Sequence, residues 1–250
     1  MIKPEDEVIL FDFWTYENVR YLIKHLKCNT VHVWFWNTLN DYRPRIFSLS
    51  TDKTILFHTF DPQDANQHEM FLHNQIYRLP EQKNLATYEI YDFFFIGLNK
   101  GRFGTLKELN SRLLEWGYTT KFIIVDRHEK CGVIDGIEIR NKEVDYNETL
   151  QLIRQSKVLV DCTKTKQSGI TLRVIEGLFL NKKVLSNNSA IKNLPFYTPS
   201  RIFFMNELND KETLKRFMRT PILPATEEEK KPYDINHWIQ EIVNTKTPMS

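Results

Sequence analysis

Residues 157–186 read KVLVDCTKTKQSGITLRVIEGLFLNKKVLS. The segment begins and ends with short apolar runs, at 157–161 and 183–186, which are typical of strands buried on both faces of a sheet. Between them, apolar side chains from residue 169 to 180 recur with the spacing of an amphipathic helix. Because a helix that connects two such strands places them parallel in one sheet, the segment predicts an α/β fold.

The same alternation of apolar runs and amphipathic stretches continues on both sides of this segment. A further helix is predicted to begin at a capping box, Thr105 with Glu108, and to end before Gly117. The other predicted strands are 8–11, 31–36, 54–60, 91–96, 122–126 and 201–205; the other predicted helices are 16–26, 64–74, 148–155 and 235–243, with a hairpin around Asp135-Gly136. We therefore expect two Rossmann-like lobes with parallel sheets.

A polar stretch at residues 79–84 marks the expected boundary between the lobes. The boundary gives a compact N-terminal lobe, residues 1–84, and a larger C-terminal lobe, residues 85–230. The last segment, residues 231–250, carries a helix that could pack back on the N-terminal lobe. A chain of 250 residues accommodates two lobes only if one of them is small.

Composition excludes several classes of function. The chain has 34 basic and 32 acidic residues, a net charge of +2, so a broad nucleic-acid-binding face is not expected. No apolar run reaches the roughly 18 residues of a membrane span, and the N-terminal sequence MIKPEDE lacks the pattern of a signal peptide. Cys28, Cys131 and Cys162 are too widely spaced to predict a disulfide framework or a zinc site. We expect buried thiols in a cytoplasmic protein.

Glycine is rare, with eight in the chain, and three of them lie between residues 97 and 104. Gly97, Gly101 and Gly104 surround the cations Lys100 and Arg102 in a predicted loop between a strand and a helix. Backbone amides, a helix N-terminus and two cations suit a phosphate or diphosphate. The alternative is a surface loop whose glycines only allow the chain to turn.

A second candidate site lies inside the segment quoted first. Ser168 or Thr171 could supply an oxygen at the helix start, and Gly169 would let a ligand approach the backbone. Arg173 and Glu176 are three residues apart and share one face of the helix. The alternative for this pair is a surface salt bridge.

The motifs QSGITLR (167–173), EGLF (176–179) and KKVLSNN (182–188) resemble the donor-binding lobe of GT-B glycosyltransferases. More narrowly, they look like bacterial enzymes that build lipopolysaccharide core or capsular polysaccharide. The segments DFFFIGLNKGR (92–102) and FDPQDA (60–65) are similar to the same group. The resemblance covers residues 88–205 well and the first lobe loosely.

The resemblance implies a nucleotide-sugar donor, used as a co-substrate without a further cofactor, and a cell-surface glycan or glycolipid as acceptor. Ser168, Gly169 and Thr171 match the place where the family binds the donor's diphosphate. Arg173, together with Lys100 or Arg102, would neutralise the leaving diphosphate. Glu176 stands where the family's glutamate contacts ribose or sugar hydroxyls.

The sequence also departs from the family. It contains no Asp-x-Asp triplet, so we expect no metal and a reaction in which helix dipole and cations stabilise the diphosphate. The two-glutamate signature of retaining relatives is incomplete, because Ser168 occupies the upstream position. The stereochemical outcome is therefore left open, and the acceptor lobe is shorter than in typical members.

An inverting reaction would need a base from the first lobe. Asp12 and Asp61 each follow a predicted strand and are candidates, with helix or turn capping as the alternative. His58 is a more remote candidate, whereas the spacing of His68 and His73 does not align two ligands on one helix face. The tryptophans Trp14, Trp34 and Trp36 could stack on sugar rings, and the alternative is an aromatic core.

Two other functions remain open at this level: an epimerase-like isomerase of sugar nucleotides, and a non-catalytic scaffold that binds a nucleotide or a partner. Peripheral contact with the inner face of a membrane is also open, because residues 211–219 could form an interfacial amphipathic helix. The alternative is a solvated helix packed on its own lobe.

Overall fold

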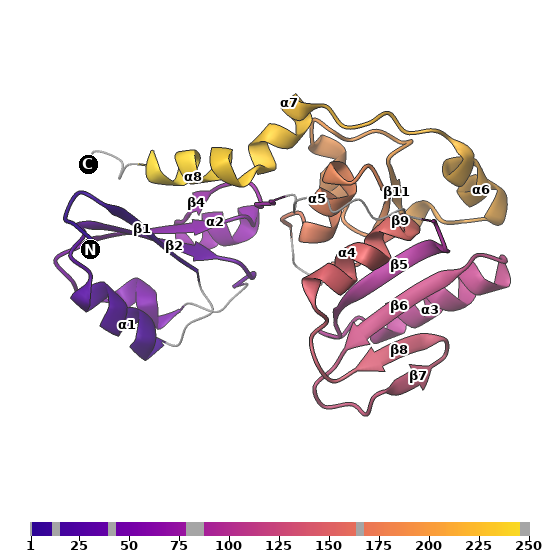
Figure 1. Cartoon of the computed structure of the whole chain (residues 1–250), viewed down its shortest axis with the longest axis horizontal. Helices are drawn as coiled ribbons and strands as arrows, with labels where there is room; N and C mark the ends of the chain where they lie inside the picture. Colours follow the sequence, from indigo (N-terminus) through magenta and orange to yellow (C-terminus); the bar gives the residue numbers. More distant parts are fainter. Residues whose placement is uncertain (1, 12–15, 40–43, 79–87, 164–167, 246–250) are drawn as a thin grey trace. The chain divides into compact units, whose positions relative to one another are not determined.

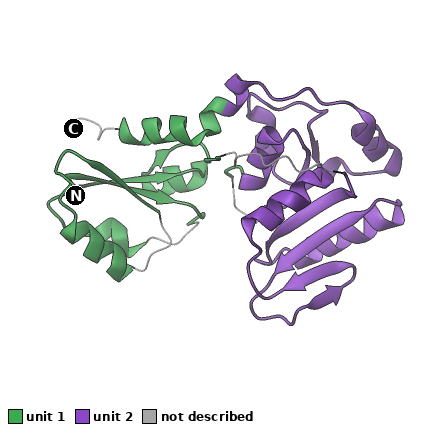
Figure 2. Cartoon of the chain, viewed as in Figure 1, with its two compact units in different colours: residues 1–78, 166–170, 231–250 green, residues 79–165, 171–230 purple. Residues whose placement is uncertain are grey.

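The computed structural model describes residues 2–11, 16–39, 44–78, 88–163 and 168–245. The chain forms two compact units, each a Rossmann-like lobe (Figure 2). Unit 1 comprises residues 1–78, 166–170 and 231–250, and unit 2 comprises residues 79–165 and 171–230. The predicted boundary at residue 84 lies outside the described residues.

Unit 1 is built around a four-stranded parallel sheet with the order β1-β2-β3-β4. Figure 1 shows helices α1 and α8 on opposite sides of this sheet. The strands are β1 (Glu7–Phe11), β2 (Thr30–Phe35), β3 (Thr54–Thr59) and β4 (Phe71–Leu72). The α-helices are α1 (Tyr16–His25), α2 (Pro62–His68) and α8 (Ile235–Val243). Two 3-10 helices are η1 (Arg45–Ser48) and η4 (Lys231–Tyr233), which lies at the start of the last segment of unit 1.

The alternation of side chains along the strands of unit 1 produces two apolar layers. On one face, Val31 and Val33 of β2 pack with Val19 and Ile23 of α1. On the other face, Trp34 belongs to a cluster whose other buried members are Phe60, Ile76, Trp238 and Ile242. Trp34 and Trp238 meet edge to face, with their ring centroids 5.0 Å apart. The C-terminal helix α8 therefore completes the core of unit 1.

Unit 2 contains a seven-stranded sheet with the order β11-β10-β9-β5-β6-β8-β7, in which the edge strand β7 is antiparallel to β8. The strands are β5 (Tyr91–Leu98), β6 (Thr120–Val125), β7 (Gly132–Ile134), β8 (Ile137–Arg140), β9 (Ser156–Asp161), β10 (Lys183–Ser186) and β11 (Ile202–Phe204). The helices are α3 (Phe103–Glu115), α4 (Tyr146–Arg154), α5 (Leu172–Phe179), η2 (Ser189–Asn193), η3 (Met205–Glu207), α6 (Lys211–Arg219) and α7 (Glu227–Lys230).

Both faces of this sheet are covered, as the apolar strands predict. One cluster joins Phe93 and Phe95 of β5 to Leu106 and Leu113 of α3 and to Phe217 of α6. The opposite face has a separate cluster, in which Phe94 and Leu159 pack with Ile153 of α4. Successive residues of β5 thus point into different layers.

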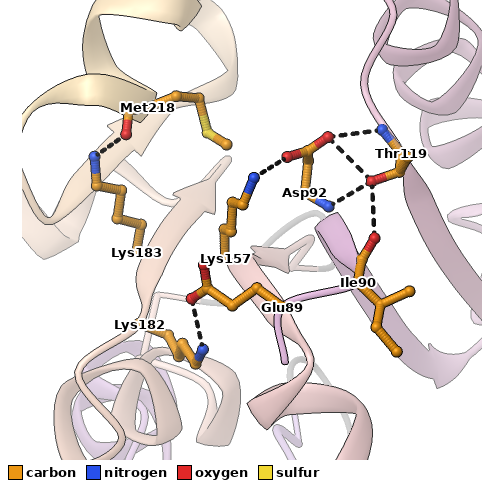
Figure 3. A network of polar contacts seen from close by, with 8 residues as sticks. All are labelled: Glu89, Ile90, Asp92, Thr119, Lys157, Lys182, Lys183 and Met218. Carbon is orange, nitrogen blue, oxygen red and sulfur yellow. Dashed lines mark hydrogen bonds and ion pairs between the residues drawn. The ribbon is translucent and has the colours of Figure 1, made fainter. Parts of the chain in front are cut away.

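Ion pairs tie strands together at the amino edge of the sheet (Figure 3). Lys157 of β9 donates to Asp92 Oδ1 of β5 at 2.8 Å, and Thr119 N donates to Asp92 Oδ2 at 2.9 Å. Although burial opposes it, the hydrogen bonds from Lys157 and Thr119 hold the pKa of Asp92 below its ordinary value. Lys182 pairs with Glu89 at 3.2 Å. The charges at this edge of the sheet therefore partner one another.

Most predicted elements are confirmed within a few residues, and α8 is confirmed at both ends. The hairpin is confirmed too, because Asp135 and Gly136 have positive φ angles of 50° and 77° between β7 and β8, as a tight hairpin turn requires. Gly117 follows the end of α3 with a φ of 82°, which confirms the predicted glycine stop.

The predicted helix at residues 64–74 is wrong in its bounds. Asp61 caps α2, which begins at Pro62, and the helix ends at His68 because Glu69 adopts a left-handed conformation with a φ of 55°. Residues 71 and 72 then pair with β3 as the short strand β4. The alternation of apolar residues over this segment does not distinguish a helix end from so short a strand.

Two predicted helix starts are also wrong. Helix α3 begins at Phe103, so Thr105 and Glu108 lie inside it and form no capping box. Instead, Asn99 Oδ1 accepts a hydrogen bond from Phe103 N at 3.3 Å. Helix α5 begins at Leu172 rather than at residue 169. Among the cysteines, Cys28 and Cys162 are buried, whereas Cys131 is exposed, which corrects the expectation of three buried thiols.

Candidate functional site

The carboxyl edge of the sheet in unit 2 gathers buried polar side chains at the end of β9. Asp161, the last residue of β9, is 2% exposed. Its Oδ1 accepts a hydrogen bond from Thr171 Oγ1 at 2.7 Å, and its Oδ2 accepts one from Ser186 Oγ at 2.6 Å. Thr171 is the N-cap residue of α5 but makes no side-chain cap bond, because its hydroxyl binds Asp161. The carboxylate therefore ties the ends of two neighbouring strands to the start of α5.

Burial raises the pKa of Asp161, although the hydroxyls of Ser186 and Thr171 and the charges of Arg173 and Arg102 act in the opposite direction. Sequence reasoning passed over Asp161 and Ser186 as site residues. Their only signal is their position as the polar ends of two adjacent apolar strands, which parallel pairing brings into register.

Arg102 lies at the turn between β5 and α3. Its guanidinium donates to Leu98 O and to Cys162 O, both at 2.5 Å, and lies 5.3 Å from the centre of the Phe95 ring. Burial lowers the pKa of Arg102. These contacts hold a cation at the end of β5, beside the chain that leaves β9.

The predicted three-glycine loop is shorter than expected, because Gly97 belongs to β5 and Gly104 belongs to α3. The turn itself contains Lys100 and Gly101, which have positive φ angles of 45° and 79°. Gly101 therefore allows the chain to turn, which was the alternative to a phosphate-binding loop. Lys100 is exposed at the tip of this turn.

The first turns of α5 carry a buried ion pair. Arg173 Nη1 lies 2.6 Å from Glu176 Oε2, in a geometry that makes this an ion pair rather than a directed hydrogen bond. Tyr146 of α4 donates its hydroxyl to Glu176 Oε1 at 3.0 Å. The side chains of Arg173 and Glu176 are 14% and 0% exposed, so the alternative of a surface salt bridge is wrong.

Burial raises the pKa of Glu176, while Arg173 and the Tyr146 hydrogen bond lower it. Glu176 and Asp161 are thus two buried carboxyl groups with raised pKa values near two guanidinium groups. Arg173 lies in the first turn of α5, and Arg102 donates to Cys162 O just after β9. These two cations and the positive end of α5 can bind an anion.

A reciprocal amide pair extends this edge to β10. Asn187 Oδ1 accepts from Thr163 N at 2.8 Å and from Thr163 Oγ1 at 2.9 Å, and Asn187 Nδ2 donates to Thr163 O at 3.2 Å. The two residues directly follow the strand ends near Asp161. Their hydrogen bonds fix the backbone just after β9 and β10. The spacing of Thr163 and Asn187 in the sequence does not predict this role.

In unit 1, Ser168 and Gly169 lie around the carboxylate of Asp61, which is 1% exposed. Asp61 accepts hydrogen bonds from Gln63 N and Asp64 N of α2. It also accepts from Ser168 N at 2.8 Å, Ser168 Oγ at 2.8 Å and Gly169 N at 2.7 Å. These contacts favour the capping alternative for Asp61 over a role as base.

Gly169 is needed for packing against unit 1's own backbone, because a Cβ there would lie 2.6 Å from Phe60 O. Ser168 and Gly169 belong to unit 1, whereas Thr171, Arg173 and Glu176 belong to unit 2. Asp12 and Trp14 lie outside the described residues.

Within the described residues, the candidates Trp34, Trp36 and His58 pack in the core of unit 1. Trp34 is fully buried, and Trp36 lies beside Phe11, with ring centroids 5.9 Å apart. His58 is fully buried between His32 and His73. His58 is therefore inaccessible to an acceptor.

No cluster of three or more histidine, cysteine, aspartate or glutamate side chains in the described part of the chain could hold a metal ion. Within the same residues, no helix has the length and apolar character needed to cross a membrane.

Comparisons with known proteins extend this description. No protein-family model matches the sequence, and no curated protein matches it. Among solved structures, the chain is similar to AviGT4, a glycosyltransferase involved in avilamycin A biosynthesis, with a TM-score of 0.56 and 9% sequence identity. The match covers 92% of this chain and 78% of that chain. At this identity the likeness shows a shared fold of two Rossmann-like lobes.

Proposed function

We propose that this protein is a glycosyltransferase that moves a sugar from a nucleotide-sugar donor to a glycan or glycolipid acceptor. The fold shared with AviGT4 supports this class of enzyme. The observation that carries the proposal is the pair of guanidinium groups, Arg102 and Arg173, beside the carboxyl edge of the sheet in unit 2. Ligands of open parallel sheets bind at this edge.

The chemistry explains why two fixed cations matter. As the bond between the sugar and the diphosphate breaks, negative charge accumulates on the leaving group, and groups already aimed at it lower the barrier. Arg102 and Arg173 are held in place by their own contacts, and the positive end of α5 adds to their effect. Lys100 at the exposed turn could reach the same anion. We propose that this reaction is independent of metal ions.

Four residues have a different role in this proposal from the one that the sequence resemblance implies. Glu176 is fully buried, so it acts on the donor through Arg173, whose position it fixes. The amides of Ser168 and Gly169 bind Asp61, and they could bind a diphosphate only by exchanging that carboxylate for it. Thr171, fixed to Asp161, places the first turn of α5.

The acceptor side of the proposal rests on the sequence. Asp12 is the proposed base if the reaction inverts, because the carboxylate of Asp61 already accepts five hydrogen bonds as a cap. We propose a cell-surface acceptor of the lipopolysaccharide or capsular type and a cytoplasmic enzyme. Helix α6 buries Leu214 and Phe217 in unit 2, so any contact with a membrane would be made by its basic residues.

Calorimetry with UDP, GDP, ADP and CMP tests the proposal. We expect one of them to bind saturably, Arg173→Gln to weaken that binding at least about tenfold, and Arg173→Lys to retain part of it, since a lysine keeps the charge but not the planar fork. Arg127→Gln is the matched control, because Arg127 pairs with Glu143 on the exposed surface of unit 2. Absence of binding by all four nucleotides would contradict the proposal.

An NMR time course with the donor that corresponds to the nucleotide bound separates transfer from isomerisation. A glycosyltransferase leaves the sugar stereochemistry of the intact donor unchanged when no acceptor is present. Conversion of the donor into an epimer under those conditions would identify an isomerase instead.

A further inference from the structure

Four side chains form a continuous hydrogen-bonded row across the sheet of unit 1. Glu7 Oε2 lies 3.1 Å from His32 Nε2, His32 Nδ1 lies 2.9 Å from His58 Nε2, and His58 Nδ1 lies 3.0 Å from His73 Nε2. His32 and His58 are fully buried, and the carboxylate end at Glu7 is 39% exposed. At the other end, His73 Nε2 lies 3.5 Å from Thr245 Oγ1, just after helix α8.

The carboxylate fixes the positions of the ring protons along the row. Glu7 as a carboxylate can only accept, so Nε2 of His32 carries a proton and its Nδ1 must accept in the neutral ring. His58 must then donate from Nε2, and His73 must donate from Nε2 to His58 Nδ1. All three neutral rings therefore hold their proton on Nε2, and every bond in the row points towards Glu7.

The contact with Thr245 follows from this order. Thr245 Oγ1 donates its own proton to Glu241 O at 2.9 Å, so its lone pairs are available to the Nε2 proton of His73. In the neutral row this proton is donated to His58 Nδ1 at 3.0 Å, and Thr245 Oγ1, at 3.5 Å from the same nitrogen, is a weaker second acceptor. The row thus ends in an attractive contact with the C-terminal end of α8.

We propose that the Glu7–His32–His58–His73 row is a proton-binding site that controls how the end of α8 is attached to unit 1. One added proton is accommodated if it rests on His32 beside Glu7. His32 Nδ1 then donates to His58 Nε2, and His58 Nδ1 donates to His73 Nε2. Every bond between the histidines reverses, and His73 carries its proton on Nδ1.

The reversal has a direct consequence for α8. His73 Nε2 becomes an acceptor, so its lone pair faces the lone pairs of Thr245 Oγ1 while that hydroxyl remains bonded to Glu241 O. The contact changes from attractive to repulsive, and the last turn of α8 loosens. A second proton would force two N–H groups to face each other in the row and would break it.

The surroundings of the row favour the charge at the Glu7 end. Burial lowers the pKa of His58 to about 3 and that of His73 to about 4, and neighbouring histidines add to this effect. Burial lowers the pKa of His32 as well, but its hydrogen bond to Glu7 acts in the opposite direction. A proton taken up by the row is therefore best placed on His32.

The ionisable groups of α8 near the row have partners of their own. Helix α8 carries His237 and Glu241, which pair with each other at 3.5 Å, and its cap Asp234 accepts from Asn236 N. The residue of β4 that lies against His58 is Phe71, whose side chain carries no charge. His68 of α2 lies against Phe47, a residue of the α1-facing cluster.

Two measurements on the full chain test the proposal. Nitrogen-15 NMR of the imidazole rings should show the Nε2–H form for His32, His58 and His73 at pH 8, and Nδ1–H for His58 and His73 once the first proton is bound. Hydrogen exchange of the amides of residues 241–245, corrected for the intrinsic effect of pH, should become at least about fivefold faster relative to pH 8 in the same range.

Two substitutions separate the site from its effect. Thr245→Val should leave the histidine titration unchanged and remove the pH dependence of exchange at the end of α8. Glu7→Gln should lower the pH at which the first proton binds by about one unit, because the counter-charge is lost. His128→Gln, at an exposed position of unit 2, is the control and should alter neither measurement.

The proposal is overturned if any of the three rings holds its proton on Nδ1 at pH 8. It is overturned equally if exchange at residues 241–245 has the same pH dependence in Thr245→Val as in the unaltered protein. Both readouts use proteins that retain the three histidines, so they do not depend on a core substitution.

Discussion

Gly97 lies directly against the guanidinium of Arg102: a Cβ at residue 97 would be 2.9 Å from Arg102 Nη2. The glycine therefore makes room for a cation of the protein itself. Arg102 fills that space and donates to Leu98 O and Cys162 O. The sequence predicts that Gly97 makes room for the phosphate of a ligand. In the structure Gly97 makes room for Arg102, which is itself the proposed ligand of that phosphate.

Gly97→Ala should displace the end of the Arg102 side chain. Because that end is held by two backbone carbonyl groups, its displacement weakens charge-assisted hydrogen bonds, and we expect a loss of about 1–2 kcal/mol in the free energy of unfolding. Nucleotide binding should weaken as well. Urea unfolding and calorimetry measure the two effects, and unchanged binding with lowered stability would argue against Arg102 as a diphosphate ligand.

Gly169→Ala should be more harmful to stability. The new Cβ would lie 2.6 Å from Phe60 O, a backbone atom that cannot move without disturbing the end of β3. We expect a loss of about 1–3 kcal/mol in the free energy of unfolding, the usual range for overpacking. The hydrogen bonds from residues 168 and 169 to Asp61 should weaken as well. Thermal and urea unfolding measure it.

Gly104 supplies the matched control for both substitutions. It lies inside α3, and a Cβ there would meet no atom within 4 Å. Gly104→Ala should therefore stabilise the protein by about 0.5–1 kcal/mol, because alanine is the better helix former. If all three alanine variants were equally destabilised, the distinction drawn from the contacts would be wrong.

Much of the fold could be predicted because apolar strands and amphipathic helices leave a strong periodic signal. The C-terminal helix at residues 235–243 is confirmed at both ends, since Asp234 caps it and its apolar side chains keep a regular spacing. The bounds of α2 were missed because its cap is Asp61, directly before Pro62, and because Glu69 ends it in a left-handed conformation. The start of α3 was missed because its capping contact comes from the preceding loop. Asn99, four residues before Phe103, replaces the capping box that Thr105 and Glu108 appeared to offer.

The candidate site could be predicted only in part. Arg173 and Glu176 pair as their helical spacing indicates, but the hydrogen bond that Glu176 accepts comes from Tyr146, which lies in another helix. Asp161 is not recognisable from spacing because Ser186 is brought to it by the pairing of β10 with β9, and Thr171 by the start of α5. The histidine row was missed for the same reason: His32, His58 and His73 are far apart in sequence and meet only across β2, β3 and the end of β4.

Lys183 provides a prediction about the core of unit 2. This lysine is 8% exposed, and its Nζ donates to the carbonyl oxygens of Phe217, Met218 and Thr220 at the end of α6. Lys183→Met keeps most of the side-chain volume but leaves those carbonyl groups without their donor. We expect a loss of about 2–4 kcal/mol in the free energy of unfolding. Each buried unsatisfied group costs about 1–3 kcal/mol, but the total is smaller than three such costs because the end of α6 can move and bind water. Denaturant unfolding measures this loss, with Lys215→Met on the exposed face of α6 as the control.

The histidine row makes the stability of unit 1 depend on pH in a direction that can be stated. His58 has a pKa near 3 in the folded protein against an ordinary value of 6.5, so between those pH values the unfolded chain binds a proton that the folded chain excludes. The stability contributed by the neutral ring is complete above pH 6.5 and is lost as the pH falls towards 3. In that interval each such histidine contributes a slope of about 1.4 kcal/mol per pH unit.

His58→Phe tests this dependence. The variant should be less stable than the unaltered protein at pH 8, because His32 Nδ1 and His73 Nε2 lose their partner, at a cost of about 2–4 kcal/mol. Its stability should also fall less steeply with acid, by about one proton's slope between pH 6 and pH 4. The two curves of unfolding free energy against pH should therefore converge as the pH falls. Curves that stay parallel would contradict this prediction, because His58 would then take up its proton equally in the folded and unfolded states.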